Sequence, residues 1–283
     1  MDLILAPLGY PIFVSSLLAV ALVGAVCAVV GTFVVLRGVA FIGDAISHAA
    51  FPGVVAAFVL RGPYYIGAAI AAVATALAIT FVSRRTHLRA DTAIGVLFAG
   101  TFALGIFLYS TIDGYAPDLM GFLVGSVLGI SATDLIGLSI LGGLVLLTIV
   151  VFWKELLYAT FDPLGAAASG LPVTAMEYLF LVLVAMTIVV SLQAVGIILV
   201  VAMLVTPAAT AQLLTVRFGQ LVAVAMALGV GASIVGLYVS FWFDVASGAT
   251  IVLIQTLAFV VALAIGAVRS RRRPAGAAAP ATG

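Results

Sequence analysis

The sequence predicts an all-α, polytopic membrane protein with eight or nine transmembrane helices. Of the 283 residues, 65% are hydrophobic and only 7% are charged, whereas roughly a quarter of the residues in soluble domains are charged. Apolar segments recur at about the 20-residue length with which a helix crosses the hydrocarbon core and satisfies its own backbone hydrogen bonds. The alternating pattern of a transmembrane β-barrel is absent from the sequence.

Charged and turn-forming residues divide this apolar chain into nine predicted spans. If one of them is re-entrant, the number of crossings falls to eight. We expect a single transmembrane domain over residues 1–268, followed by a basic tail (269–283) with the composition of a disordered segment. The external segment 111–132 is expected to hold a short re-entrant or surface helix. The predicted spans cover residues 13–36, 38–60, 64–83, 92–110, 133–153, 175–194, 196–214, 219–241 and 247–268.

The basic residues predict the orientation of these spans, because Lys and Arg collect in short cytoplasmic loops. We expect the N-terminus outside the cell and the C-terminus in the cytoplasm, an arrangement that needs an odd number of crossings. Only Arg61 then falls on the outer side. The basic residues on the cytoplasmic side are Arg37, Arg84, Arg85, Arg89, Lys154, Arg217, Arg269, Arg271, Arg272 and Arg273.

The composition also excludes several functions. A net charge of +1 provides no basic surface for nucleic acid. The single lysine, Lys154, lacks both the glycine-rich run and the following Ser or Thr of a P-loop, so the chain is not expected to hydrolyse ATP. Energy-driven work would therefore require an ATPase in another polypeptide. The single cysteine, Cys27, lies in an apolar run and is expected to be a small buried hydrophobic residue.

Most ionisable residues lie at the ends of the predicted spans, where their side chains can reach the membrane surface, but Asp44 and His48 lie inside a span. Ionisable groups inside a membrane helix are costly and are therefore candidates for a functional site. A spacing of four residues places both side chains on one helix face, where a carboxylate and an imidazole can bind Mn²⁺, Zn²⁺ or Fe²⁺. Counted along a continuous helix from Arg37, His48 would lie near the bilayer midplane. We expect Pro52 and Gly53 to interrupt this helix.

Two ligands make a weak metal site. If the protein is a homodimer with this helix near its two-fold axis, symmetry supplies a second pair. Two alternatives stay open: a hydrogen bond between Asp44 and His48 that only locks the helix, and a proton relay. Polar residues within the apolar spans are candidates to line a pathway, although close packing of helices is the simpler explanation for the stretches 191–196 and 206–211. These candidates are Ser47, Gln193 and Thr206.

A short helix is predicted over residues 162–170, in a cytoplasmic connection. Asp162 is suited to the N-cap, Pro163 to the first helical position, and Gly170 to the C-terminal end. This helix is either an ordinary connector or a docking element for a soluble partner. Elsewhere, Asp91 is expected to cap the span that begins at Thr92.

Several of these motifs together resemble a known family. The segments Val34–Arg37, Phe41–Gly53, Asp91–Gly95, Phe161–Pro163, Gly170–Pro172 and Ser191–Gly196 are similar, in the same order, to segments of the permease subunit of zinc/manganese ABC importers. The resemblance implies a fold related to that of the vitamin B12 importer. It also implies a homodimeric channel in a bacterial cell membrane, two cytoplasmic ATPase subunits, and an extracytoplasmic metal-binding protein.

The resemblance also implies roles for individual residues. Asp44 and His48 would contact the transported metal, which is manganese, zinc or iron, and no resident cofactor is expected. The helix that docks onto the ATPase would include Asp162, Pro163, Leu164, Gly165 and Gly170. Two other functions remain to be distinguished from an ABC importer: a proton-coupled secondary metal carrier that uses Asp44 and His48 as titrating groups, and a membrane scaffold or sensor that transports nothing.

Overall fold

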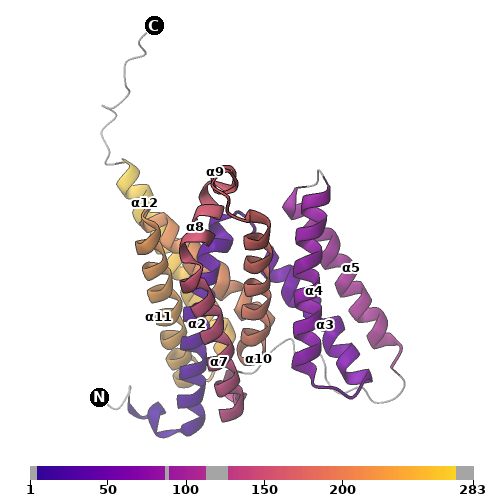
Figure 1. The fold of residues 1–283 in the computed structure, drawn as a ribbon. Coiled ribbons are helices and arrows are strands. Elements are labelled where there is room, and N and C mark those ends of the chain that lie inside the picture. The colour runs from indigo at the N-terminus through magenta and orange to yellow at the C-terminus, as the bar shows by residue number, and fades with distance from the viewer. Residues whose placement is uncertain (1–4, 87–88, 113–126, 272–283) are drawn as a thin grey trace.

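The computed structural model describes residues 5–86, 89–112 and 127–271, and all regular structure in these ranges is helical (Figure 1). Nine helical segments in this part of the chain are long and apolar enough to cross a membrane, as the sequence predicts, and α10 supplies two of them. The elements are η1 (Pro7–Gly9), α2 (Pro11–Leu36), α3 (Ile42–Val59), α4 (Tyr64–Arg85), α5 (Ala90–Ser110), η2 (Val127–Gly129), α7 (Ala132–Val151), α8 (Trp153–Phe161), α9 (Pro163–Ala168), α10 (Val173–Leu214), α11 (Phe218–Phe243) and α12 (Ser247–Arg271).

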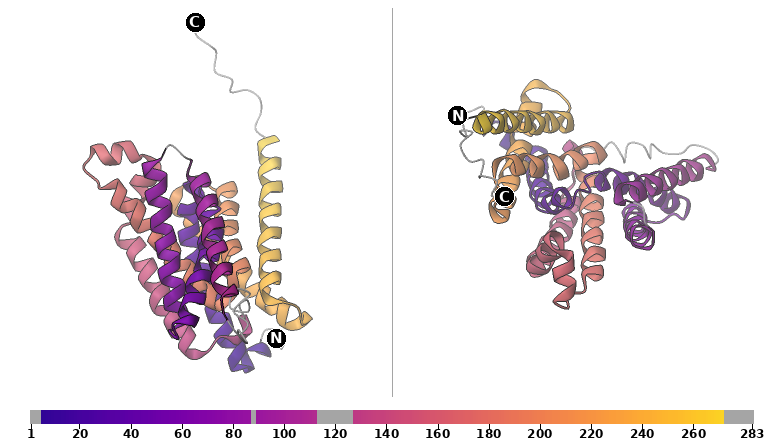
Figure 2. Two further views of the ribbon diagram at one scale, coloured as in Figure 1. Left: turned by 90° about the vertical axis from the view of Figure 1, so that its right-hand side faces the viewer. Right: turned by 90° about the horizontal axis from the view of Figure 1, so that it is seen from above.

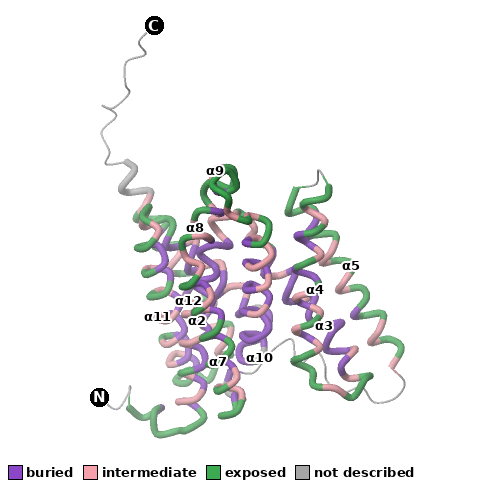
Figure 3. The backbone as a smooth tube through the Cα atoms, in the orientation of Figure 1, coloured by how far each residue is buried: buried purple, intermediate pink, exposed green. Residues whose placement is uncertain are grey.

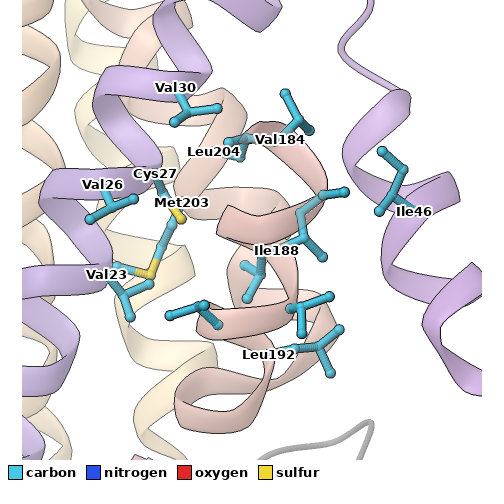
Figure 4. Close-up of a cluster of buried hydrophobic side chains, with 14 of the residues drawn as sticks. Val23, Val26, Cys27, Val30, Ile46, Val184, Ile188, Leu192, Met203 and Leu204 are labelled. Atoms are coloured by element: carbon cyan, nitrogen blue, oxygen red, sulfur yellow. The ribbon is translucent and has the colours of Figure 1, made fainter. Parts of the chain in front are cut away.

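Helices α2 and α10 form the centre of the molecule. Each carries more buried residues than any other helix, whereas α5, α7 and α12 leave most of their length partly or fully exposed (Figure 3). Cys27 is free and buried, as predicted, and its sulfur lies 3.6 Å from the Ser191 hydroxyl of α10. The labelled side chains of this core in Figure 4 are Val23, Val26, Cys27 and Val30 of α2, Ile46 of α3, and Val184, Ile188, Leu192, Met203 and Leu204 of α10.

The helices form two groups. Helices α3, α4 and α5 lie together on the right of Figure 1, and the view from above in Figure 2 separates them in the same way from α2, α7, α11 and α12. Helix α10 packs against α3 and α4 as well as against α2, α11 and α12, so it joins the two groups. Residues 37–41 lead from α2 in the larger group to α3 in the smaller one.

The prediction of one span over residues 38–60 is wrong at its beginning. Gly38 has φ 69°, and the Val39 amide donates to the Val34 carbonyl at 3.2 Å, so α2 ends in a Schellman motif. Helix α3 therefore begins only at Ile42.

The predicted interruption at Pro52 is wrong, and so is the continuous helix from Arg37 on which the predicted depth of His48 is based. Because residues 37–41 are not helical, the count along a continuous helix from Arg37 does not apply. Helix α3 runs through Pro52 to Val59. Pro52 lacks the N–H that would otherwise bond to the His48 carbonyl, and membrane helices tolerate this loss when neighbouring helices surround the proline.

Glycines allow close contacts between helices, and a glycine also forms the break inside α10. Gly53 of α3 and Gly67 of α4 lie so close that a Cβ on either would overlap the carbonyl oxygen of the other. The break predicted between spans 175–194 and 196–214 is confirmed: Gly196 has φ 75° and ψ 171° within α10. That conformation is essentially restricted to glycine.

Two further expectations concern helix ends. Helix α5 begins at Ala90 with Arg89 as its N-cap residue, so the prediction that Asp91 caps a helix starting at Thr92 is wrong. Asp91 lies in the first turn, where its charge favours the helix dipole. Helix α12 extends to Arg271, so the predicted start of the disordered tail at residue 269 is wrong. Residues 113–126 and 272–283, which hold most of the predicted external segment 111–132 and the rest of the tail, lie outside the described residues.

Gly31 offers a test of the packing between α2 and α10. A Cβ at Gly31 would overlap the Leu204 backbone carbonyl, so Gly31→Ala should lower the stability of the purified protein by about 1–3 kcal/mol. The measurement is the midpoint of thermal unfolding in detergent. Gly137→Ala on α7 is the matched control, because a Cβ there meets open space. Equal effects of the two substitutions would contradict the proposed close contact.

Candidate functional site

Asp44 and His48 lie in the first two turns of α3, on one face of the helix, as predicted. The His48 Nε2 and Asp44 Oδ1 atoms are 3.5 Å apart, and the two side chains are 27% and 45% exposed, respectively. This separation is longer than the 2.7–3.2 Å typical of N–H···O hydrogen bonds. The pair is therefore not a short, buried hydrogen bond that locks the helix. Both side chains are accessible from outside the chain.

Two phenylalanines of α5 hold the imidazole ring of His48. Its centroid lies 5.4 Å from the ring of Phe98 and 5.1 Å from that of Phe102, in both cases edge to face. The His48 Nδ1 atom is buried and has no hydrogen-bond partner. The aromatic contacts orient the ring so that Nε2 is the nitrogen near Asp44. The spacing of four residues between Phe98 and Phe102 is visible in the sequence, but their contact with His48 depends on how α3 and α5 pack.

Asp44 and His48 provide an incomplete ligand set for a metal ion. Within the described ranges, no group of three or more His, Cys, Asp or Glu side chains is placed to hold a metal. Zn²⁺ usually takes four ligands, and Mn²⁺ favours octahedral oxygen-rich sites. One copy of the chain can therefore bind a divalent ion only weakly through these two side chains.

The other candidates to line a pathway lie in α3 and α10. Ser47 is buried, and its hydroxyl donates to the Gly43 carbonyl at 2.7 Å, so it bonds to its own helix. Thr206 is half-buried in the second half of α10, and its carbonyl accepts from the Thr210 hydroxyl at 2.7 Å. The side chain of Gln193 lies outside the part of the chain that the structure describes.

The predicted short helix is present as α9. The Asp162 carboxylate accepts from the Gly165 amide at 2.9 Å, and Pro163 occupies the first helical position. At the other end Gly170 has φ 87°, and the Gly170 amide donates to the Ala167 carbonyl at 3.0 Å. The predicted cap residues are thus confirmed. Leu164 projects from this helix and is 85% exposed, so α9 displays an apolar side chain.

A cavity of about 460 Å³ lies beside α9, at the ends of several helices. Its wall includes an ion pair in which the Arg84 Nε and Glu177 Oε2 atoms are 2.6 Å apart, linking the end of α4 to the beginning of α10. In the sequence, Arg84 indicates only the cytoplasmic side of the membrane, and nothing pairs it with Glu177. The two residues are 93 positions apart, so no local pattern links them.

Comparisons with known proteins agree with this architecture. Residues 9–266 match the family model of the ABC 3 transport family. The chain is 48% identical over 255 residues to the manganese transport system membrane protein MntC of Halalkalibacterium halodurans, covering 90% of this chain and 87% of that protein. It is 38% identical to a Haemophilus influenzae protein described as a probable iron transport system membrane protein, covering 93% of each chain.

A solved structure is similar over nearly the whole chain. It is PsaBC from Streptococcus pneumoniae in complex with Fab, which matches with a TM-score of 0.81 and 37% sequence identity. The match covers 93% of this chain and 94% of that chain.

The cap of α9 can be tested directly. Replacing Asp162 with Ala removes the acceptor for the Gly165 amide and should cost about 1 kcal/mol of local helix stability. We expect amide hydrogen exchange at Gly165 and Ala166 to become several-fold faster. Asp162→Asn is the matched control, because it keeps a side-chain oxygen at the N-cap. Unchanged exchange in the Ala variant would show that the cap does not hold α9.

Proposed function

Because this chain belongs to the ABC 3 transport family, we propose that it is the permease of an ATP-driven importer that carries manganese, zinc or iron into a bacterial cell. Permeases of this family are transmembrane subunits that do not hydrolyse ATP themselves. The observation that carries the choice of substrate is the accessible Asp44–His48 pair on a membrane helix. The names of the relatives, which refer to manganese and iron transport systems, support the same class of ion.

In this proposal the metal ion contacts the Asp44 carboxylate and His48 Nε2 during its passage. A homodimer with α3 near its two-fold axis would place four such ligands around one ion. The exposure of both side chains and the shortage of further ligands in the described residues support a shared site. Ligation by few side chains also suits transport, because an ion held by a complete ligand cage would not be released.

The energy for transport would come from two cytoplasmic ATPase subunits that dock onto α9. The exposed Leu164 and the capped ends at Asp162 and Gly170 support this role, because they present a rigid helix with an apolar side chain to a partner. An extracytoplasmic metal-binding protein would deliver the ion to the opposite face. We place the N-terminus outside and the C-terminus in the cytoplasm, on the distribution of arginines.

Metal uptake tests the two ligands. The complete complex with ATPase and metal-loaded binding protein, reconstituted in proteoliposomes, should take up radioactive manganese, and Asp44→Ala and His48→Ala should each reduce uptake at least about tenfold, equivalent to about 1.4 kcal/mol. Asp91→Ala is the control, since its carboxylate is exposed in the first turn of α5. Wild-type uptake in both site variants would contradict a metal path along α3.

The same system distinguishes an ABC importer from a proton-coupled carrier. The permease alone, in liposomes with a pH gradient, should transport no metal. Uptake under that condition would favour the secondary carrier instead. Stimulation of ATP hydrolysis by binding protein loaded with manganese, zinc or iron would identify the metal. The absence of flux in the complete complex would favour a scaffold or sensor.

Cross-linking tests the shared site. In a Cys27→Ser background, Asp44→Cys should link two copies through a short bifunctional thiol reagent, because four ligands around one ion bring the two positions close together. Gly137→Cys on α7 is the control, since α7 belongs to the other helix group and α10 lies between it and α3 (Figure 1). A failure of the Asp44→Cys variant to cross-link, in a sample that is dimeric by mass, would exclude α3 from the two-fold axis.

A further inference from the structure

Arg37 is the point at which three helices meet. It caps the C-terminal end of α2, and its Nε donates to the Thr160 hydroxyl of α8 at 3.0 Å. Its guanidinium carbon lies 4.0 Å from the centroid of the Phe180 ring on α10, within the range of a cation–π interaction. The Thr160 hydroxyl in turn donates to the Leu156 carbonyl, which fixes its orientation on α8.

The position of Arg37 is costly for a positive charge. Burial lowers the pKa of Arg37 to about 10, and its Nη2 atom is buried with no hydrogen-bond partner. The nearby acidic group, Glu177, raises that pKa but is itself paired with Arg84 at 2.6 Å. A buried cation with incomplete hydrogen bonding adds little to stability. A role in holding the helices in a defined arrangement explains it better.

Thr160 connects Arg37 to the proposed docking helix. It lies two positions before Asp162, the N-cap of α9. Backbone hydrogen bonds run through this junction, from the Asp162 amide to the Tyr158 carbonyl at 3.0 Å and from the Ala166 amide to the Asp162 carbonyl at 2.9 Å. Helices α8 and α9 therefore both hydrogen-bond to the backbone of Asp162, so a shift of α9 acts on the end of α8 that carries Thr160.

On its other side, Arg37 is connected to the helix that carries the metal ligands. The turn after it is short and hydrogen-bonded: the Val39 amide donates to the Val34 carbonyl, and the Ile42 amide donates to the Val39 carbonyl at 3.0 Å. Ile42 is the first residue of α3, and Asp44 follows in the same turn. Only this hydrogen-bonded turn and the first residues of α3 separate Arg37 from Asp44, so a displacement of Arg37 would shift the start of α3 and the Asp44 carboxylate with it.

The cavity of about 460 Å³ provides space for this displacement. Arg37 and Ile42 lie on its wall together with Thr160 and Pro163, so the end of α2, the beginning of α3 and the α8–α9 junction all border the same space. A close-packed interior would resist such a shift. We infer that Arg37 is a positioning residue that passes movement of the α8–α9 segment to the beginning of α3. This inference rests on the proposed function.

The ratio of metal transported to ATP hydrolysed tests the inference. In the complete reconstituted complex, Arg37→Gln and Thr160→Val should each lower this ratio at least about fivefold, while ATP hydrolysis stays within about twofold of wild type. Thr160→Ser keeps the hydroxyl and should restore the wild-type ratio. Arg85→Gln is the matched control. Like Arg37, Arg85 lies at the C-terminal end of a helix and over a phenylalanine ring, with its guanidinium carbon 5.2 Å from the centroid of Phe81. Unlike Arg37, it is not part of the cavity wall.

Other outcomes would overturn the inference. If the Arg37 and Thr160 variants keep the wild-type ratio, Arg37 does not transmit movement. If transport and ATP hydrolysis fall in proportion, together with the thermal unfolding midpoint, Arg37 is only structural. If Arg37→Gln does not fold, Thr160→Val still tests the inference, since it removes the hydroxyl that accepts from Arg37 and leaves every charge in place. Failure of the proposed function would look different, because the wild-type complex itself would then move no metal.

Discussion

The close packing of α2 against α10 is the contact on which the rest of the structure depends. Lipid tails are as apolar as Leu or Val side chains, so hydrophobicity alone does not hold membrane helices together, and close approach of backbones does. Gly31 allows the Leu204 carbonyl of α10 to approach α2, and Gly24 similarly faces Gly229 of α11. Because α10 also contacts α3 and α4, this contact ties the two helix groups into one body.

The group of α3, α4 and α5 positions Asp44 and His48, the proposed metal ligands. Gly53 and Gly67 bring α3 and α4 into close contact, and α5 supplies the phenylalanines that flank His48. The ionisable side chains thus occupy the accessible face of a helix whose other faces are packed. The proposed metal ligands lie in the first turns of α3, and the proposed docking helix begins at Pro163, on the wall of the cavity that Arg37 also borders.

Local sequence signals predicted much of this, and their failures have physical causes. Caps such as Asp162 and Gly170 were predictable because each satisfies backbone groups within a few residues of itself. The start of α3 was missed because apolar residues continue through the turn after Gly38, and hydropathy does not register a change of backbone conformation. Pro52 was expected to break a helix because the sequence does not reveal the neighbours that stabilise it. The pairing of Arg84 with Glu177 joins distant helices and leaves no local pattern.

The sequence by itself determined that the protein is a helical membrane permease, where most spans lie, and that Asp44 and His48 share one helix face. These properties follow from hydropathy, helical periodicity, the cost of burying charge in lipid, and a match of ordered motifs to one family. Tertiary structure decided which side chains surround His48, how α10 joins the two helix groups, and that Arg37 lies between the α8–α9 junction and α3. Those contacts depend on helix packing angles and close approaches between distant segments, which no short stretch of sequence encodes.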